Sequence, residues 1–182
     1  MNQISLSTEL HLRLLEENDA SEVFALVDAN RERIGEWMPW VAGTRAVADS
    51  LAFIQTCTQD NQKGDHQFAI IYKEKIVGLI GLVRTDLNNK SSSIGYWIGE
   101  DCQGLGLVTQ SVKAVLNFGF DTMEFNRIVI RAQPANTRSC AIPERLGFSL
   151  EGIAKEAEQL NGQFVDLRIY AMLRSQWQKN LT

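Results

Sequence analysis

Cysteine and histidine are scarce in this chain of 182 residues, and their spacing argues against metal and disulfide chemistry. The cysteines are Cys57, Cys102 and Cys140, and none of them belongs to a Cys-x-x-Cys pair. An odd number of widely spaced cysteines supports neither a disulfide framework nor a zinc ribbon. The two histidines, His11 and His66, form no His-Glu-x-x-His motif. We therefore expect no metal site.

An excess of positive charge is also absent. Eighteen basic residues stand against 22 acidic ones, so the net charge is −4, which is atypical of a nucleic-acid-binding protein. No apolar run is longer than five residues, whereas a helix that spans a bilayer needs about 18. Residues 1–7 have neither the basic region nor the apolar region of an export signal. We expect a cytoplasmic protein with no nucleic-acid or membrane partner.

No internal repeat and no linker rich in proline, glycine or serine divides the chain, so residues 1–182 are predicted to form one domain. Hydrophobic periodicity predicts the secondary structure. The expected strands are residues 10–14, 67–72, 75–87, 92–99, 127–132, 148–160 and 163–174. The expected helices start at Asn18 or Asp19, cover 46–62 and 105–122, and start again at Asn136. This order predicts a mixed α/β (α+β) sheet with helices on both faces.

A glycine-rich junction between a predicted strand and a predicted helix is the most informative segment. Residues 95–109 read Gly-Tyr-Trp-Ile-Gly-Glu-Asp-Cys-Gln-Gly-Leu-Gly-Leu-Val-Thr. Glycines before a helix let main-chain N–H groups approach a ligand, so this turn can hold a phosphate. The dinucleotide motif fails because its third glycine would fall at Thr109, and the Gly-Lys-Ser/Thr of a Walker motif is absent. A simple strand-to-helix turn is the alternative.

A second segment, Asn136-Thr137-Arg138-Ser139, follows the next strand and begins the next helix. Asn136 is a good N-cap, and Ser139 then lies near the free N–H groups of the first turn. Ordinary helix capping explains why an asparagine stands at position 136 but gives no specific reason for a serine at position 139. Pro143 is unexpected because it falls inside this helix, where it removes a hydrogen bond.

These segments resemble a known family. Gln103-x-x-Gly106 resembles the start of the Gln/Arg-x-x-Gly-x-Gly/Ala pyrophosphate motif of the GCN5-related N-acetyltransferases (GNAT), and the Asn136–Ser139 segment resembles their downstream motif. Other segments resemble the branch that acetylates ribosomal-protein N-termini (RimJ/RimL-type). They are Arg13-Leu14, Trp37/Trp40, Ile-Gly-Tyr-Trp-Ile at 94–98, Ala-Ile-Pro-Glu-Arg at 141–145, Glu151-Gly152 and Leu160-Asn161-Gly162. The resemblance covers the core, about residues 10–177.

The resemblance implies a mostly antiparallel central sheet that is splayed between two strands, with acetyl-CoA in the resulting cleft. The cofactor-binding residues that it implies are Trp97, Ile98, Gln103, Gly104, Leu105, Gly106, Leu107, Val108, Thr109, Asn136 and Ser139. Two positions depart from the motif. Val108 replaces its last glycine or alanine, and Leu105 replaces a common lysine, arginine or glutamine, which removes one phosphate contact.

Acetyl transfer needs a neutral amine. At pH 7 an α-amino group with a pKa near 7.7 is about one-sixth neutral, and its 2.7-unit difference from a lysine is worth about 3.7 kcal/mol. A single carboxylate can therefore serve as the base. The resemblance assigns this role to Glu158, with Glu156 and Glu151 as nearby alternatives, and assigns Ser139 to protonate the departing CoA sulfur. A solvated glutamate and a structural serine cap are the alternatives.

Trp37 and Trp40 are expected on the acceptor side, although a place in the core or at a homodimer contact is equally compatible with the sequence. The leading function is N-acetyl transfer from acetyl-CoA to a protein N-terminus, with a homodimer implied by the resemblance. The alternatives are an acetyltransferase for a small amine, such as a polyamine or an antibiotic, and a CoA-binding sensor without turnover.

Overall fold

The computed structural model describes residues 3–180, and one eight-stranded sheet organises them. The strands are β1 (Gln3–Ser5), β2 (Leu10–Leu14), β3 (His66–Tyr72), β4 (Lys75–Asp86), β5 (Ser91–Ile98), β6 (Arg127–Ala132), β7 (Ser149–Leu160) and β8 (Gln163–Leu173). The helices are α1 (Ala20–Ala29), α2 (Arg31–Gly35), α3 (Val47–Asp60), α4 (Leu107–Asn117), α5 (Thr137–Arg145) and α6 (Arg174–Asn180). None of the helices within residues 3–180 is long and apolar enough to cross a membrane.

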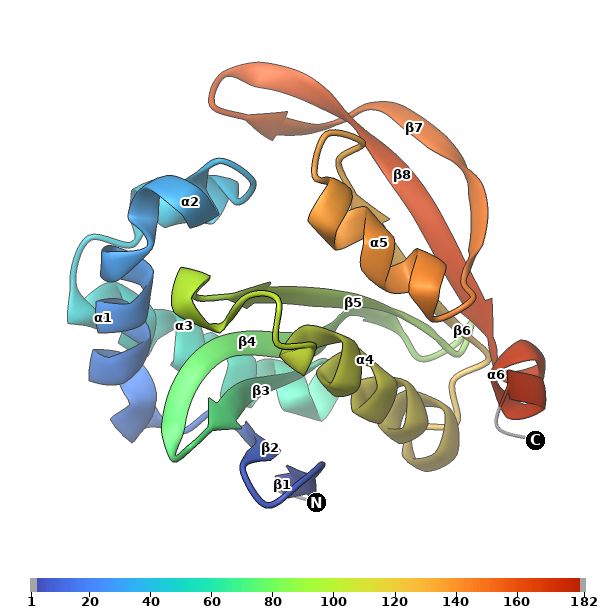
Figure 1. Cartoon of the computed structure of the whole chain (residues 1–182), viewed down its shortest axis with the longest axis horizontal. Coiled ribbons are helices and arrows are strands. Elements are labelled where there is room, and N and C mark those ends of the chain that lie inside the picture. Colours follow the sequence, from blue (N-terminus) through green and yellow to red (C-terminus); the bar gives the residue numbers. More distant parts are fainter. Residues whose placement is uncertain (1–2, 181–182) are drawn as a thin grey trace.

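The strand order in the sheet is β1-β2-β3-β4-β5-β6-β8-β7. Every neighbouring pair is antiparallel except β5 and β6, which are parallel and are connected through α4. The predicted mixed, mostly antiparallel sheet is therefore confirmed. Figure 1 shows the long hairpin of β7 and β8 arching over α5 at one end of the molecule.

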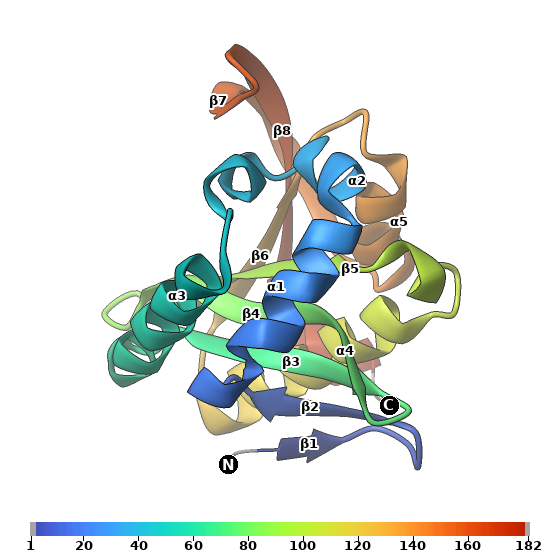
Figure 2. The ribbon, with the colours of Figure 1, turned by 90° about the vertical axis from the view of Figure 1, so that its left-hand side faces the viewer.

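Alternating side chains on the central strands cover both faces of the sheet. On β3, Phe68 and Ile70 are fully buried in a cluster with α4, whereas Ala69 and Ile71 pack into a second cluster with α1 and α3. A strand that is apolar on both sides needs helices on both sides. Figure 2 shows α1 and α3 together in front of β3 and β4. The prediction of helices on both faces is confirmed.

The sheet opens between its two parallel strands. β5 and β6 are paired from Ser91↔Arg127 to Ile94↔Ile130 and no further. Beyond this point β5 stays paired with β4 through Ile98, and β6 stays paired with β8 through Ala132. The two halves of the sheet therefore diverge after Ile94 and Ile130, as the implied splayed sheet requires.

Several local predictions need correction. The strand β1 was not expected, and it forms because it pairs with β2 at the edge of the sheet. The expected helix 105–122 begins two residues later at Leu107 and ends in a π-helical turn, Phe118–Thr122. Glycines inside a strand often mark bulges; in β4 the register does shift beside Gly78, but the pairing through Gly81 is regular. Gly81 is needed for another reason, since a Cβ there would lie 2.5 Å from the His66 carbonyl oxygen.

Candidate active site

Two cavities meet where the sheet opens. The first, about 800 Å³ in volume, is lined by the turn before α4 and by α5, and we call it the loop cleft. The second, about 510 Å³, is lined by β6 and by Glu158 and Leu167 of the β7–β8 hairpin, and we call it the hairpin cavity. Both are lined by Trp37, Met38, Tyr96, Trp97, Asn136 and Ser139. These six residues form the junction through which a group bound in one cavity can meet a group bound in the other.

The glycine turn leaves the first turn of α4 open to the loop cleft. Gly104 and Gly106 have φ values of 76° and 74°, in the left-handed region that favours glycine, and Gly106 is the N-cap residue of α4. No side chain accepts a hydrogen bond from the main chain at this cap. The free N–H groups of a helix start attract anions. The turn is therefore suited to hold a phosphate.

Nearly all the residues expected to bind the cofactor line the loop cleft. Those that do are Trp97, Ile98, Gln103, Gly104, Gly106, Leu107, Val108, Thr109, Asn136 and Ser139. Leu105 lines neither cavity, and its side chain is 52% exposed. The glycines on either side of Leu105 turn the chain so that this side chain faces solvent, and its expected place in the cleft needs this correction.

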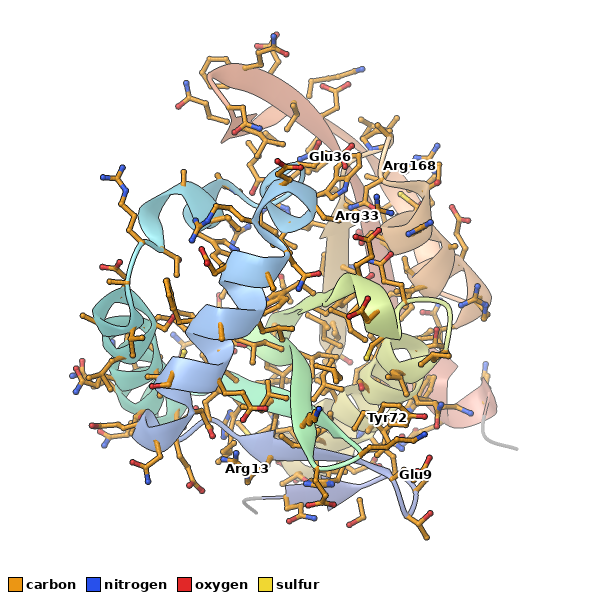
Figure 3. All side chains as sticks on the ribbon, turned by 60° about the vertical axis from the view of Figure 1, so that its left-hand side comes forward. Glu9, Arg13, Arg33, Glu36, Tyr72 and Arg168 are labelled. Atoms are coloured by element: carbon orange, nitrogen blue, oxygen red, sulfur yellow. The ribbon has the colours of Figure 1, made fainter. Side chains whose placement is uncertain are left out.

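Three arginines that were not expected to bind the cofactor supply positive charge to the loop cleft. They are Arg33, Arg138 and Arg145. Arg138 donates a hydrogen bond to Gln103, and Arg145 donates one to Thr109 Oγ1 at 3.0 Å, so α5 is tied to both ends of the glycine turn. Arg33 comes from α2 and lies between α2 and α5 in Figure 3. Arg33 also makes an ion pair with Glu100 at 3.5 Å, so Arg138 and Arg145 are the main source of this charge.

Ser139 lies at the junction and is held by Tyr96. Asn136 caps α5 as predicted, and its Oδ1 accepts a hydrogen bond from the Ser139 main-chain N–H at 3.1 Å. The Tyr96 hydroxyl donates to the Ser139 carbonyl oxygen at 3.0 Å, and Ser139 Oγ donates to the same hydroxyl at 3.2 Å. Burial raises the pKa of Tyr96, so this hydroxyl is protonated at neutral pH.

This contact also explains how α5 accommodates a proline. In an α-helix the N–H at position 143 would donate to the carbonyl at position 139, but Pro143 has no N–H. The Tyr96 hydroxyl supplies a hydrogen bond to that carbonyl from outside the helix. A buried carbonyl that loses its donor is costly. The Tyr96 hydroxyl therefore replaces the hydrogen-bond donor that Pro143 lacks.

We expect Tyr96→Phe to destabilise the protein by about 1–3 kcal/mol, because it leaves the Ser139 carbonyl without this partner. For a protein of this size that corresponds to a drop in Tm of about 2–4 °C per kcal/mol, measured by thermal denaturation. Tyr72→Phe is the matched control, because it also removes one tyrosine hydroxyl. Tyr72 lies on β3, far from Arg33 and α5 in Figure 3, and its ring contacts the Lys73 ammonium. Equal Tm values for Tyr96→Phe and Tyr72→Phe would contradict this role.

Among the three candidate carboxylates, Glu158 is the one that lines the hairpin cavity. Glu151 makes an ion pair with Arg127 at the surface, and Glu156 is exposed and lines neither cavity. The β7–β8 pairing shifts register between Ala154 and Glu158, and Glu156 has a φ of +48°. A bulge of this kind redirects the side chains that follow it. This irregularity accompanies the inward orientation of Glu158.

The expected acceptor-side tryptophans also line these cavities. Trp37 lines both cavities and Trp40 lines the hairpin cavity. The Trp40 ring packs against Trp97, with 5.9 Å between centroids, and 41% of Trp40 is exposed. Cys140, next to Ser139, is buried and donates to the Gln133 carbonyl oxygen at 3.4 Å. Within residues 3–180 no three metal-ligating side chains gather in one place.

Comparison with known proteins identifies the family. The family model described as "Acetyltransferase (GNAT) domain" matches residues 9–149. The ribosomal-protein-serine acetyltransferase of Escherichia coli is 30% identical over 171 residues, which cover 93% of this chain and 96% of that protein. Two solved structures are also similar. The microcin C7 self-immunity acetyltransferase MccE, in complex with acetyl-CoA and AMP, has a TM-score of 0.90 and 33% identity, with 94% of this chain and 96% of that chain covered.

The second structure is RimL, the ribosomal L7/L12 α-N-protein acetyltransferase, in complex with coenzyme A. It has a TM-score of 0.91 and 28% identity, and the match covers 94% of this chain and 97% of that chain. One structure holds acetyl-CoA and the other coenzyme A, and this chain shares the fold of both. The chain belongs to the GNAT acetyltransferase family, and it is an acyltransferase with acetyl-CoA as its co-substrate.

Proposed function

We propose that this protein transfers the acetyl group of acetyl-CoA to the N-terminal α-amine of a protein, with ribosomal proteins as the first candidates. The observation that carries the proposal is the junction of the two cavities at Ser139, with Glu158 in the cavity on the acceptor side. The similarity to the ribosomal-protein-serine acetyltransferase of Escherichia coli along almost the whole chain supports this class of acceptor.

In this proposal the loop cleft binds the coenzyme. The main-chain N–H groups of Gln103–Thr109 bind its diphosphate, since the first turn of α4 is open there. Arg138 and Arg145 add the charge that Leu105 does not supply. Trp97 and Ile98, at the end of β5, contact the arm that carries the thioester.

The reaction follows from the groups on the two sides of the junction. The neutral α-amine attacks the thioester carbonyl, a C–N bond forms, and the C–S bond breaks as the tetrahedral intermediate collapses. Glu158 accepts the proton that the amine loses, and the Ser139 hydroxyl turns its hydrogen from Tyr96 to the departing sulfur, where it donates a hydrogen bond to the thiolate. The start of α5 favours the negative charge that develops on this sulfur.

A small amine is the second candidate acceptor. It is favoured by the similarity to MccE, whose structure contains AMP, a small molecule, beside acetyl-CoA. The hairpin cavity, at about 510 Å³, is also within the size range of small-molecule sites.

The test is to incubate the purified protein with radiolabelled acetyl-CoA and either a ribosomal-protein fraction or a panel of small amines. We expect label in a protein band, with mass spectrometry placing the acetyl group on the α-amine of its first residue. Label confined to the small amines would reject the protein acceptor and support the second candidate.

A further inference from the structure

The hairpin cavity contains two buried hydrogen-bond donors that have no acceptor. They are Nε of Arg131 and Nε2 of Gln133, which are the two buried side-chain polar atoms without a partner in the described part of the chain. Both residues line the hairpin cavity, at the end of β6 where it has separated from β5. Buried donors are almost always paired in folded proteins. The protein itself therefore leaves one donor unpaired on each of two side chains that line this cavity.

The charges that line the hairpin cavity are mostly positive. Its charged residues are Arg84, Arg131 and Glu158, two guanidinium groups and one carboxylate. Within residues 3–180 neither Arg84 nor Arg131 has a carboxylate within 4.0 Å, although other arginines of the sheet, Arg127 and Arg168, do. Burial and the like charge of Arg84 lower the pKa of Arg131, and Glu158 opposes this only as a smaller effect. The cavity therefore has an excess of positive charge that the protein itself does not neutralise.

We propose that Arg131, with Gln133 beside it and Arg84 at the rim, binds a carboxylate of the acceptor. The enzyme then selects peptide N-termini that carry an acidic side chain close to the α-amine. This inference rests on the proposed function and names the acceptor class of the same site. A guanidinium group binds a carboxylate through two parallel hydrogen bonds, and an amide N–H adds a third donor.

The arrangement also separates the two ends of the acceptor by charge. Glu158 attracts the amine, and the two arginines attract the carboxylate, so an acceptor with both groups is oriented within the hairpin cavity. A polyamine carries positive charge along its whole length and meets like charge at Arg84 and Arg131. The inference therefore disfavours polyamines among the small amines considered.

The test compares three synthetic peptides of identical sequence except for the second residue, which follows an N-terminal serine and is glutamate, glutamine or lysine. We expect the wild-type enzyme to prefer the Ser-Glu peptide, with the Ser-Lys peptide the poorest. In Arg131→Gln we expect kcat/KM for the Ser-Glu peptide to fall about 30-fold, with much smaller changes for the other two. The Kd for CoA should not change, because Arg131 does not line the loop cleft.

Arg84→Gln provides a second variant, because the Arg84 side chain is exposed and its loss does not disturb the core. It should lower kcat/KM for the Ser-Glu peptide selectively, by a few-fold. Lys113→Gln, an exposed change on α4 outside both cavities, controls for the loss of one positive charge. Equal rates with the three peptides, or an equal loss on all of them in Arg131→Gln, would overturn this inference and leave the proposed function intact. No transfer to any peptide would overturn both.

Discussion

Glu158→Gln is expected to lower kcat by about 10²–10⁴-fold, the range typical of a lost general base. The rate falls because the amide cannot accept the proton of the attacking amine, and the activity that remains should still rise with pH as the α-amine loses its proton. Single-turnover rates measured from pH 5 to 9 with saturating acetyl-CoA check both effects. Binding of CoA should be unchanged, since Glu158 lines the hairpin cavity and not the loop cleft.

The matched control is Glu156→Gln on the same strand. Glu156 is exposed and lines neither cavity, so this variant should keep the wild-type rate and pH profile. A wild-type rate in Glu158→Gln would reject the assignment of the base. The remaining rate in that variant reflects the fraction of α-amine that is already neutral, which is about one-sixth at pH 7 for a pKa of 7.7.

Gly78→Ala is expected to destabilise the protein by about 3 kcal/mol or more, one of the largest effects that a single methyl group can have here. A Cβ at this position would lie 2.3 Å from the Trp97 carbonyl oxygen and 2.8 Å from Ile98 Cα. Both are main-chain atoms of the neighbouring strand, so no rotation of a side chain can relieve the overlap. β4 and β5 would have to move apart at the end of β5 that lines both cavities.

Thermal denaturation and CoA titration together measure this effect. A loss of 3 kcal/mol corresponds to a drop in Tm of about 6–12 °C for a protein of this size. The affinity for CoA should fall as well, because Trp97 and Ile98 line the loop cleft. Gly43→Ala is the control, since no atom lies within 4 Å of the Cβ that it would add. A Tm for Gly78→Ala within 2 °C of that control would refute the close approach of the two strands.

Much of the fold was predictable because local patterns specify it. The strand 127–132 and the first strand at 10–14 have the predicted bounds, since β-branched and alternating residues extend over the whole of each element. The features that were missed depend on contacts between distant segments. Residues 3–5 become β1 only because β2 offers a partner, and Gly81 is required by the approach of β3 and not by a bulge.

The candidate site divides in the same way. The glycine turn and the Asn136 cap could be predicted because each is a local motif with a known spacing. Arg131 could not be predicted as a site residue, since an arginine in a short strand can simply lie on an exposed face of the sheet. Its significance arises where β6 separates from β5, which is a property of the sheet and not of the strand. The inward orientation of Glu158 likewise depends on an irregular pairing with β8 that no local sequence pattern predicts.

The pairing of Pro143 with Tyr96 has a consequence for any change at either position. An ordinary residue at 143 would bring an N–H that competes for the Ser139 carbonyl, and the Tyr96 proton would then be free to turn towards Ser139 Oγ. The direction of that hydrogen bond would reverse, so the serine would accept where it now donates. The residue at position 143 therefore sets the direction of the hydrogen bond between Tyr96 and the Ser139 hydroxyl, although its own side chain takes no part in that bond.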